Sequence, residues 1–164
     1  MSGLVALALS IGGLGGLATW LSFGPLAGMV TIWGIFIAWG AFFHSGGDTA
    51  ALKSTIICGI FGAIMAGVAF ILMGAIPLGD VLTATVWVGV TVFILVYASK
   101  VPALATIPVA VYGYAATAAY AIHVGGSTSA ADLTNPVVVI SLSMIAGAVF
   151  GLVSGKLAGA LTSE

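Results

Sequence analysis

Charged side chains are almost absent from this 164-residue sequence, which has no arginine, three lysines and four acidic residues. Its charged fraction is 4%, against about 25% in an ordinary soluble domain. A water-exposed surface cannot be built from so few charges, and the apolar fraction is 62%. The chain is therefore predicted to be an all-α integral membrane protein in contact with a lipid bilayer. Without a basic patch to meet phosphates, nucleic-acid binding is excluded.

Reactive and metal-binding side chains are also scarce. The lone Cys58 lies in an apolar run and is expected to pack as a small hydrophobic residue. Together with two histidines on other segments, it falls short of a zinc site. No P-loop, G-x-S-x-G or H-E-x-x-H pattern occurs in the sequence, so neither an enzyme nor a bound cofactor is predicted.

Six apolar runs are present, each close to the roughly 20 residues that a helix needs to cross a bilayer. They cover residues 3–21, 24–43, 50–74, 80–98, 102–122 and 136–157. The first run lacks a positively charged segment before it, so it is interpreted as a membrane span and not as a signal peptide. Before the last run, Asn135 is predicted to be the N-cap and Pro136 the first helical residue.

The few charges predict an orientation. With six spans, Lys53, Lys100 and Lys156 fall on one side of the membrane, whereas Asp80 and Asp132 fall on the other. By the positive-inside rule the lysine side is cytoplasmic. The sequence therefore predicts a multi-pass protein of the cytoplasmic (inner) membrane with both termini in the cytoplasm. No apolar run carries a clearly central charge of the kind that ion-coupled transporters keep, which favours passive movement of a neutral solute.

Both histidines lie in a repeated motif. His44-Ser45-Gly46-Gly47 recurs 79 residues later as His123-Val124-Gly125-Gly126. At the same spacing, Trp33-Gly34 matches Tyr112-Gly113. Chance similarity between Ala/Gly-rich segments is the alternative to a duplication. If the chain is duplicated, each half (about 3–75 and about 80–157) holds three spans. Because three is odd, the halves form two inverted three-helix repeats within a single membrane domain.

Two interpretations of the motif are open. In the first, it is a helix–helix connection: glycine ends one helix, and Asp48 or Ser127 caps the next. In the second, residues 48–55 and 127–135 form short helices that dip toward the bilayer and direct free N–H groups at a permeating solute. A neutral imidazole beside them offers one donor and one acceptor.

The second interpretation defines a candidate solute path made of the motif residues, nearby aromatic residues and one amide. These residues are His44, His123, Gly46, Gly47, Gly125, Gly126, Trp39, Phe43, Tyr120 and Asn135. The predicted function is a channel or facilitator for a small neutral polar solute the size of water, ammonia, urea or a short amide. Histidine has an unperturbed pKa of about 6.5, so modulation by pH is predicted. The alternative is a membrane scaffold or partner subunit that transports nothing.

Small residues recur every fourth position in several runs, and this spacing lets membrane helices approach closely. The clearest rows are Gly59, Ala63 and Gly67, and Gly147, Gly151 and Gly155. Most of them are expected to pack helices within the bundle. Because such faces exceed what six helices need, a homo-oligomer is also predicted.

Four sequence features together form a pattern that covers nearly the whole chain. They are an aromatic-rich second span, the double glycine after it, Lys53 and a small-residue third span. In these features the sequence resembles the YcdZ-like family of small bacterial inner-membrane proteins of unknown function. That resemblance implies a membrane protein and supplies no functional residues. The three-plus-three layout is also similar to that of aquaporins, although the Asn-Pro-Ala signature is absent. Paired histidines resemble those of ammonium channels, which have more spans.

Overall fold

Residues 1–162 are described by the structure, a computed structural model. In these residues six α-helices follow one another without a β-strand. They are α1 (Gly3–Phe23), α2 (Ile32–His44), α3 (Thr49–Ala75), α4 (Asp80–Tyr97), α5 (Ile107–His123) and α6 (Pro136–Leu161). Two short 3-10 turns, Ala98–Lys100 and Pro102–Leu104, join α4 to α5. The predicted all-helical fold is therefore confirmed for the described residues.

Four helical segments are long and apolar enough to cross a membrane. They are Gly3–Phe23, Thr49–Ala75, Asp80–Lys100 and Pro136–Leu161, and they agree with four of the six predicted spans to within a few residues. The other two helices are shorter. α2 has 13 residues and α5 has 17, which correspond to about 20 and 26 Å at 1.5 Å per residue. Both lengths are below the roughly 30 Å of a typical hydrocarbon core.

The late start of α2 and α5 has a local cause. Residues 24–31 were expected to begin the second span, but Gly24 ends α1 and Gly28 has a φ of +80°, which only glycine adopts readily. α2 begins after Thr31, whose Oγ1 accepts a hydrogen bond of 3.2 Å from the Gly34 N–H. Before α5, Pro102 begins a 3-10 turn instead of an α-helix. Turn chemistry at glycine and proline therefore shortens both helices at their N-terminal ends.

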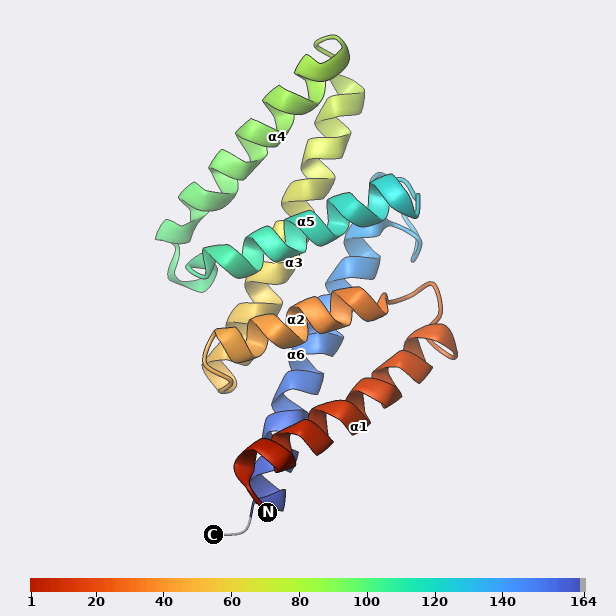
Figure 1. Cartoon of the computed structure of the whole chain (residues 1–164). Helices are drawn as coiled ribbons and strands as arrows, with labels where there is room; N and C mark the ends of the chain where they lie inside the picture. Colours follow the sequence, from red (N-terminus) through yellow and green to blue (C-terminus); the bar gives the residue numbers. More distant parts are fainter. Residues whose placement is uncertain (163–164) are drawn as a thin grey trace.

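The helices form two layers (Figure 1). α3 and α6 pack against each other, and α2 and α5 lie in front of them in the view shown. The most extensive contacts join α5 to α3 and α2 to α6, while α1 lies along α6 and α4 along α3. α2 and α5 run in opposite directions and touch each other only slightly. In Figure 1 the α2–α3 and α4–α5 connections lie toward the left, the α1–α2 and α5–α6 connections toward the right, the α3–α4 connection at the top and the N-terminus at the bottom.

Glycines allow the helices to cross at close range. A Cβ placed on Gly62 of α3 would overlap the carbonyl of Ala110 on α5. In the same way, a Cβ on Gly147 of α6 would overlap the carbonyl of Ile35 on α2. By contrast, a Cβ on Gly12 of α1 would meet no other atom within 4 Å. Gly147 belongs to a predicted row and Gly62 does not. Within the rows, a Cβ on Gly59 or Gly67 would also overlap a side chain of α6, Met144 or Val137, so the expected helix packing holds for these members.

Candidate functional site

The first copy of the repeated motif is a tight connection between α2 and α3. α2 ends at the exposed His44, and Gly46 and Gly47 follow with φ of +118° and +70°. The Gly47 N–H donates to the Phe42 carbonyl at 3.0 Å. Asp48 then caps α3, because its Oδ1 accepts from the Ala51 N–H at 2.7 Å. This geometry agrees with the first interpretation of the motif, a helix–helix connection in which glycine ends one helix and Asp48 caps the next.

The second copy also ends a helix but does not lead directly into another. His123 is the exposed last residue of α5, and Gly125 and Gly126 have φ of +102° and +100°. Residues 124–135 then form an irregular loop. The predicted short helices are therefore wrong in both halves, because 127–135 is non-helical and 49–55 is the start of α3. Ser127 caps no helix, and its hydroxyl is hydrogen-bonded to that of Ser129 at 2.8 Å.

Asn135 is the residue that begins α6. Its Oδ1 accepts from the Val137 N–H at 2.8 Å, so the predicted N-cap is confirmed. The amide nitrogen donates to the carbonyls of Thr128 and Ala130 at 3.0 and 2.8 Å. These three bonds hold the loop against the helix start. Asn135 also lines a cavity of about 230 Å³ between α3 and α6.

Trp39 lies inside the contact between α2 and α6. The side chain is 3% exposed, and its ring stacks on Phe36 and on Phe150 with centroids 5.8 and 5.4 Å apart. Its Nε1–H donates to the Ser154 Oγ. Phe43 is half-buried and makes an edge contact with Phe42 at 5.3 Å. Neither Trp39 nor Phe43 lines the two cavities described next.

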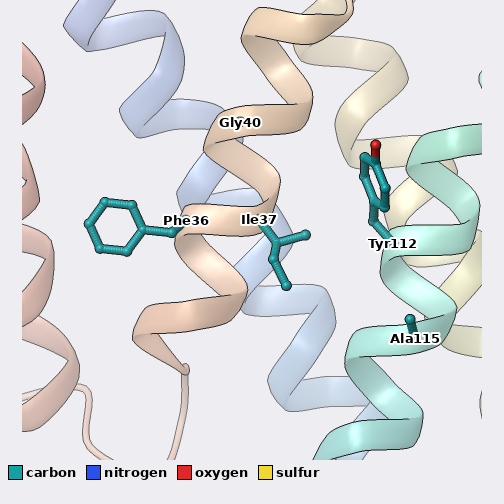
Figure 2. Close-up of a pocket in the computed structure, with 5 residues that line it drawn as sticks. All are labelled: Phe36, Ile37, Gly40, Tyr112 and Ala115. Atoms are coloured by element: carbon teal, nitrogen blue, oxygen red, sulfur yellow. The ribbon is translucent and has the colours of Figure 1, made fainter.

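An open surface hollow of about 320 Å³ lies between α2 and α5, and all of its lining residues are exposed. α2 contributes Phe36, Ile37 and Gly40, and α5 contributes Tyr112 and Ala115. Figure 2 shows Ile37 and Tyr112 projecting from their helices into the space between them. We call this hollow the central cavity. Its walls are apolar except for the Tyr112 hydroxyl, which has no hydrogen-bond partner among the described residues.

A second cavity, of about 350 Å³, lies where the α1–α2 connection and the start of α2 meet the end of α5. Its lining consists of Ser22, Phe23, Ala27, Gly28, Val30, Thr31, Ile32, Trp33, Tyr120 and Val124. We call it the Tyr120 cavity. Tyr120 was predicted to be a path residue. Its side chain is only 9% exposed, and no hydrogen bond to its hydroxyl is present within residues 1–162.

The two cavities follow one another along the same pair of helices. Because α2 and α5 are antiparallel (Figure 1), Trp33 lies near the Tyr120 end of α5, and Gly40 lies near Tyr112. His44 and His123 are at opposite ends of the pair, so the structure does not bring them together. The lining roles of Trp33 and Tyr112 were missed by the sequence analysis. Their matched aromatic character at the 79-residue spacing was the available signal.

No charged side chain lines the central cavity or the Tyr120 cavity. Outside the helices, the Thr134 side-chain hydroxyl and backbone N–H donate to the Asp132 carboxylate at 2.6 and 2.8 Å. These two bonds hold the pKa of Asp132 below its ordinary value. Within the described part of the chain, no group of three or more His, Cys, Asp or Glu side chains is placed to hold a metal ion.

Comparison with known proteins gives one match. The profile of a family described as "Protein of unknown function (DUF1097)" matches residues 8–159, nearly the whole chain. No curated protein matches the sequence, and no solved structure matches it either.

Proposed function

The chain belongs to the DUF1097 family of proteins of unknown function, and we propose that it is a membrane channel or facilitator for a small neutral polar solute. The observation that carries this proposal is the succession of two cavities along α2 and α5, the helices that bear the repeated motif. Neither cavity has a charged lining residue, so a neutral solute suits both. The absence of a central charge also argues for passive movement.

The proposal includes two inverted three-helix repeats. Its support is an exchange of packing partners between the halves. α2 packs on α6 while α5 packs on α3, and α1 lies along α6 while α4 lies along α3. The matched glycines of α2 and α5 show the same exchange of partner helices. Gly34 of α2 lies against Ser143 of α6, and Gly113 of α5 lies against Gly59 of α3. A pseudo-two-fold axis between α2 and α5 accounts for all these pairs.

We further propose that all six helices cross the cytoplasmic (inner) membrane, with both termini in the cytoplasm. In this placement the short α2 and α5 stand near the membrane normal where the bilayer is locally thinned, and the longer α3 and α6 are tilted, as helices that exceed the bilayer thickness are. Figure 1 supports this placement with the α2–α3 and α4–α5 connections toward one side and the α1–α2 and α5–α6 connections toward the other, while the α3–α4 connection lies at the top of the view. Lys53 and Lys100 fall on the cytoplasmic side. The predicted cytoplasmic C-terminal residue, Glu164, lies outside the described residues.

A homo-oligomer belongs to the same proposal. The central cavity is a hollow between two helices that touch only slightly. A polar solute crossing beside lipid would lose its hydrogen bonds to water without replacement. A second copy that covers this face would separate the path from lipid.

A membrane scaffold or partner subunit is the second candidate function. The geometry of the motif favours it, because His44 and His123 are exposed at helix ends and the glycines form turns. Trp39 and Asn135 also use their polar groups in structural hydrogen bonds. Under this alternative the exposed apolar faces bind another protein.

Flux measurements in proteoliposomes distinguish the two functions. Water, ammonia, urea and acetamide are tested by stopped-flow light scattering or pH change, with empty liposomes as the reference. Gly40→Leu should fill the central cavity and reduce flux, because a Cβ at Gly40 meets open space and the helix can accept the side chain. Gly12→Leu, on α1, is the matched control and should leave flux unchanged. Rates equal to those of empty liposomes for every solute would favour the scaffold.

A further inference from the structure

We propose that the Tyr120 cavity is a binding site for an uncharged planar carbonyl compound of the urea and carboxamide class. This inference deepens the proposed function and rests on it, because it selects one class among the solutes considered above. Water and ammonia are predicted to pass without specific recognition at this site. The argument uses the size of the cavity, its free hydrogen-bond donors and its aromatic walls.

Size is the first consideration. The cavity holds about 350 Å³, and one water molecule occupies about 30 Å³ of the liquid. A site for a single water or ammonia would be far smaller. Small-molecule sites in proteins begin at roughly 300 Å³. The Tyr120 cavity is therefore large enough for an amide or a urea that carries a modest substituent.

The polar groups of the lining decide what the ligand must offer. The Ser22 hydroxyl already donates to the Ala18 carbonyl at 2.8 Å, and the Thr31 Oγ1 accepts from the Gly34 N–H. Three side-chain donors are left: the hydroxyls of Thr31 and Tyr120 and the indole N–H of Trp33, none of which donates to a partner in residues 1–162. Tyr120 is more than nine-tenths buried, so its hydroxyl depends on the cavity for a partner. Free donors call for an acceptor in the ligand, and a carbonyl oxygen has two lone pairs.

The remaining walls favour a flat, neutral molecule. Phe23, Trp33 and Tyr120 place three aromatic side chains around the cavity. The face of a planar amide packs well against such rings. A carboxylate or an ammonium group would enter without a counter-ion, because no charged residue lines the cavity, and an unpaired charge is costly to remove from water. Ureas and carboxamides satisfy both conditions, since they are planar, uncharged and carry a strong acceptor.

Binding can be measured without transport. Saturation-transfer NMR on the full-length protein in lipid nanodiscs, with benzamide and acetamide as probes, should show contact with the wild type. Tyr120→Phe removes one hydrogen bond and keeps the ring, so the affinity should fall about three- to tenfold. Tyr97→Phe is the matched control: the same change at an exposed tyrosine of α4 that lines neither the Tyr120 cavity nor the central cavity. That variant should bind as the wild type does.

Charged analogues complete the test. Benzoate and benzylammonium should show no saturation transfer that depends on Tyr120. Equal binding of benzoate and benzamide, equal losses in the two tyrosine variants, or no binding of any amide would each overturn the inference. Amide binding that depends on Tyr120, in a protein that conducts nothing in proteoliposomes, would support the site and refute the proposed channel. The two failures are therefore distinguishable.

Discussion

The indole N–H of Trp39 on α2 donates a hydrogen bond of 2.9 Å to the hydroxyl oxygen of Ser154 on α6. The Ser154 hydroxyl donates in turn to the Gly151 carbonyl at 2.8 Å. From α1, the Ser10 hydroxyl donates to the Ser154 carbonyl at 2.7 Å. One turn of α6 thus contacts both α1 and α2 through hydrogen bonds. Ser10, Trp39 and Ser154 are all buried at this position.

Ser154→Ala should lower the free energy of unfolding by about 1–2 kcal/mol, because it leaves the buried Trp39 N–H without an acceptor. Unfolding by sodium dodecyl sulfate in mixed micelles measures this loss. Trp39→Phe and the double variant complete a double-mutant cycle. The double variant should cost less than the sum of the single changes. Strict additivity would show that the bond contributes nothing.

Helix-crossing glycines should differ sharply from an exposed one. Gly62→Ala and Gly147→Ala force a methyl group against a backbone carbonyl of the neighbouring helix, and should destabilise the fold by about 1–3 kcal/mol or more. Gly12→Ala has open space around its Cβ and should be neutral or stabilising by up to about 1 kcal/mol, since alanine is the better helix former. The same micelle titration applies. Similar effects at all three positions would contradict the described crossings.

Much of the fold was accessible from the sequence, because long apolar runs and their end signals act locally. Asn135 before Pro136 set the start of α6, and Asp48 set that of α3. The start of α2 was not accessible, since an apolar stretch containing Pro25 and Gly28 can be counted as span or as loop. Hydropathy does not separate these two possibilities, whereas the φ of +80° at Gly28 does.

The candidate site was less accessible, because cavities depend on how helices cross. Tyr120 was found through its place beside the repeated motif. Trp39 has the same aromatic character, yet its neighbours on α6 bury it and occupy its N–H. Which face of α2 meets α6 depends on contacts more than 100 residues away in the chain. A single sequence carries no direct record of such contacts.

Cysteine labelling tests the proposed topology. In a Cys58→Ala background, single cysteines are placed at Lys100, Asp80 and Asp132, all of which are exposed. A membrane-impermeant maleimide added to intact cells should label positions 80 and 132 and should reach position 100 only after lysis. Labelling of positions 80 and 100 from the same side would reject the six-crossing arrangement. The control is the Cys58→Ala protein without an added cysteine.

The two histidines provide a test of pH modulation. His44 and His123 are exposed at opposite ends of the α2–α5 pair. If both border the path, the flux of a neutral solute should depend on pH, because histidine is the side-chain type that changes charge near neutral pH. His44→Gln with His123→Gln should flatten this profile and keep flux at pH 8, because glutamine is a neutral donor and acceptor. A double variant with an unaltered profile would place both histidines outside the path.

Asp132 should titrate abnormally in the α5–α6 loop. Its hydrogen bonds from Thr134 stabilise the carboxylate, so its pKa is lowered. A lowered folded-state pKa means that this contribution to loop stability is present at neutral pH and is lost as the pH falls through that pKa. Thr134→Val removes the hydroxyl donor and should raise the pKa of Asp132 toward its ordinary value. The carboxyl carbon shift in labelled protein reports the titration, and equal pKa values in both proteins would refute the role of the hydroxyl.

The exchange of packing partners has a consequence for biosynthesis. α2 emerges from the ribosome long before α6, the helix on which it packs. Until α6 has been synthesised, the α2 face around Gly34 and Ala38 lacks the protein surface on which it packs. It can contact only lipid or a chaperone. Tertiary assembly must therefore wait for the last helix, so premature termination before α6 should leave a product open to membrane proteases. Residues 1–75 and 76–164, produced as separate polypeptides, should each be short-lived alone and protect one another when co-expressed.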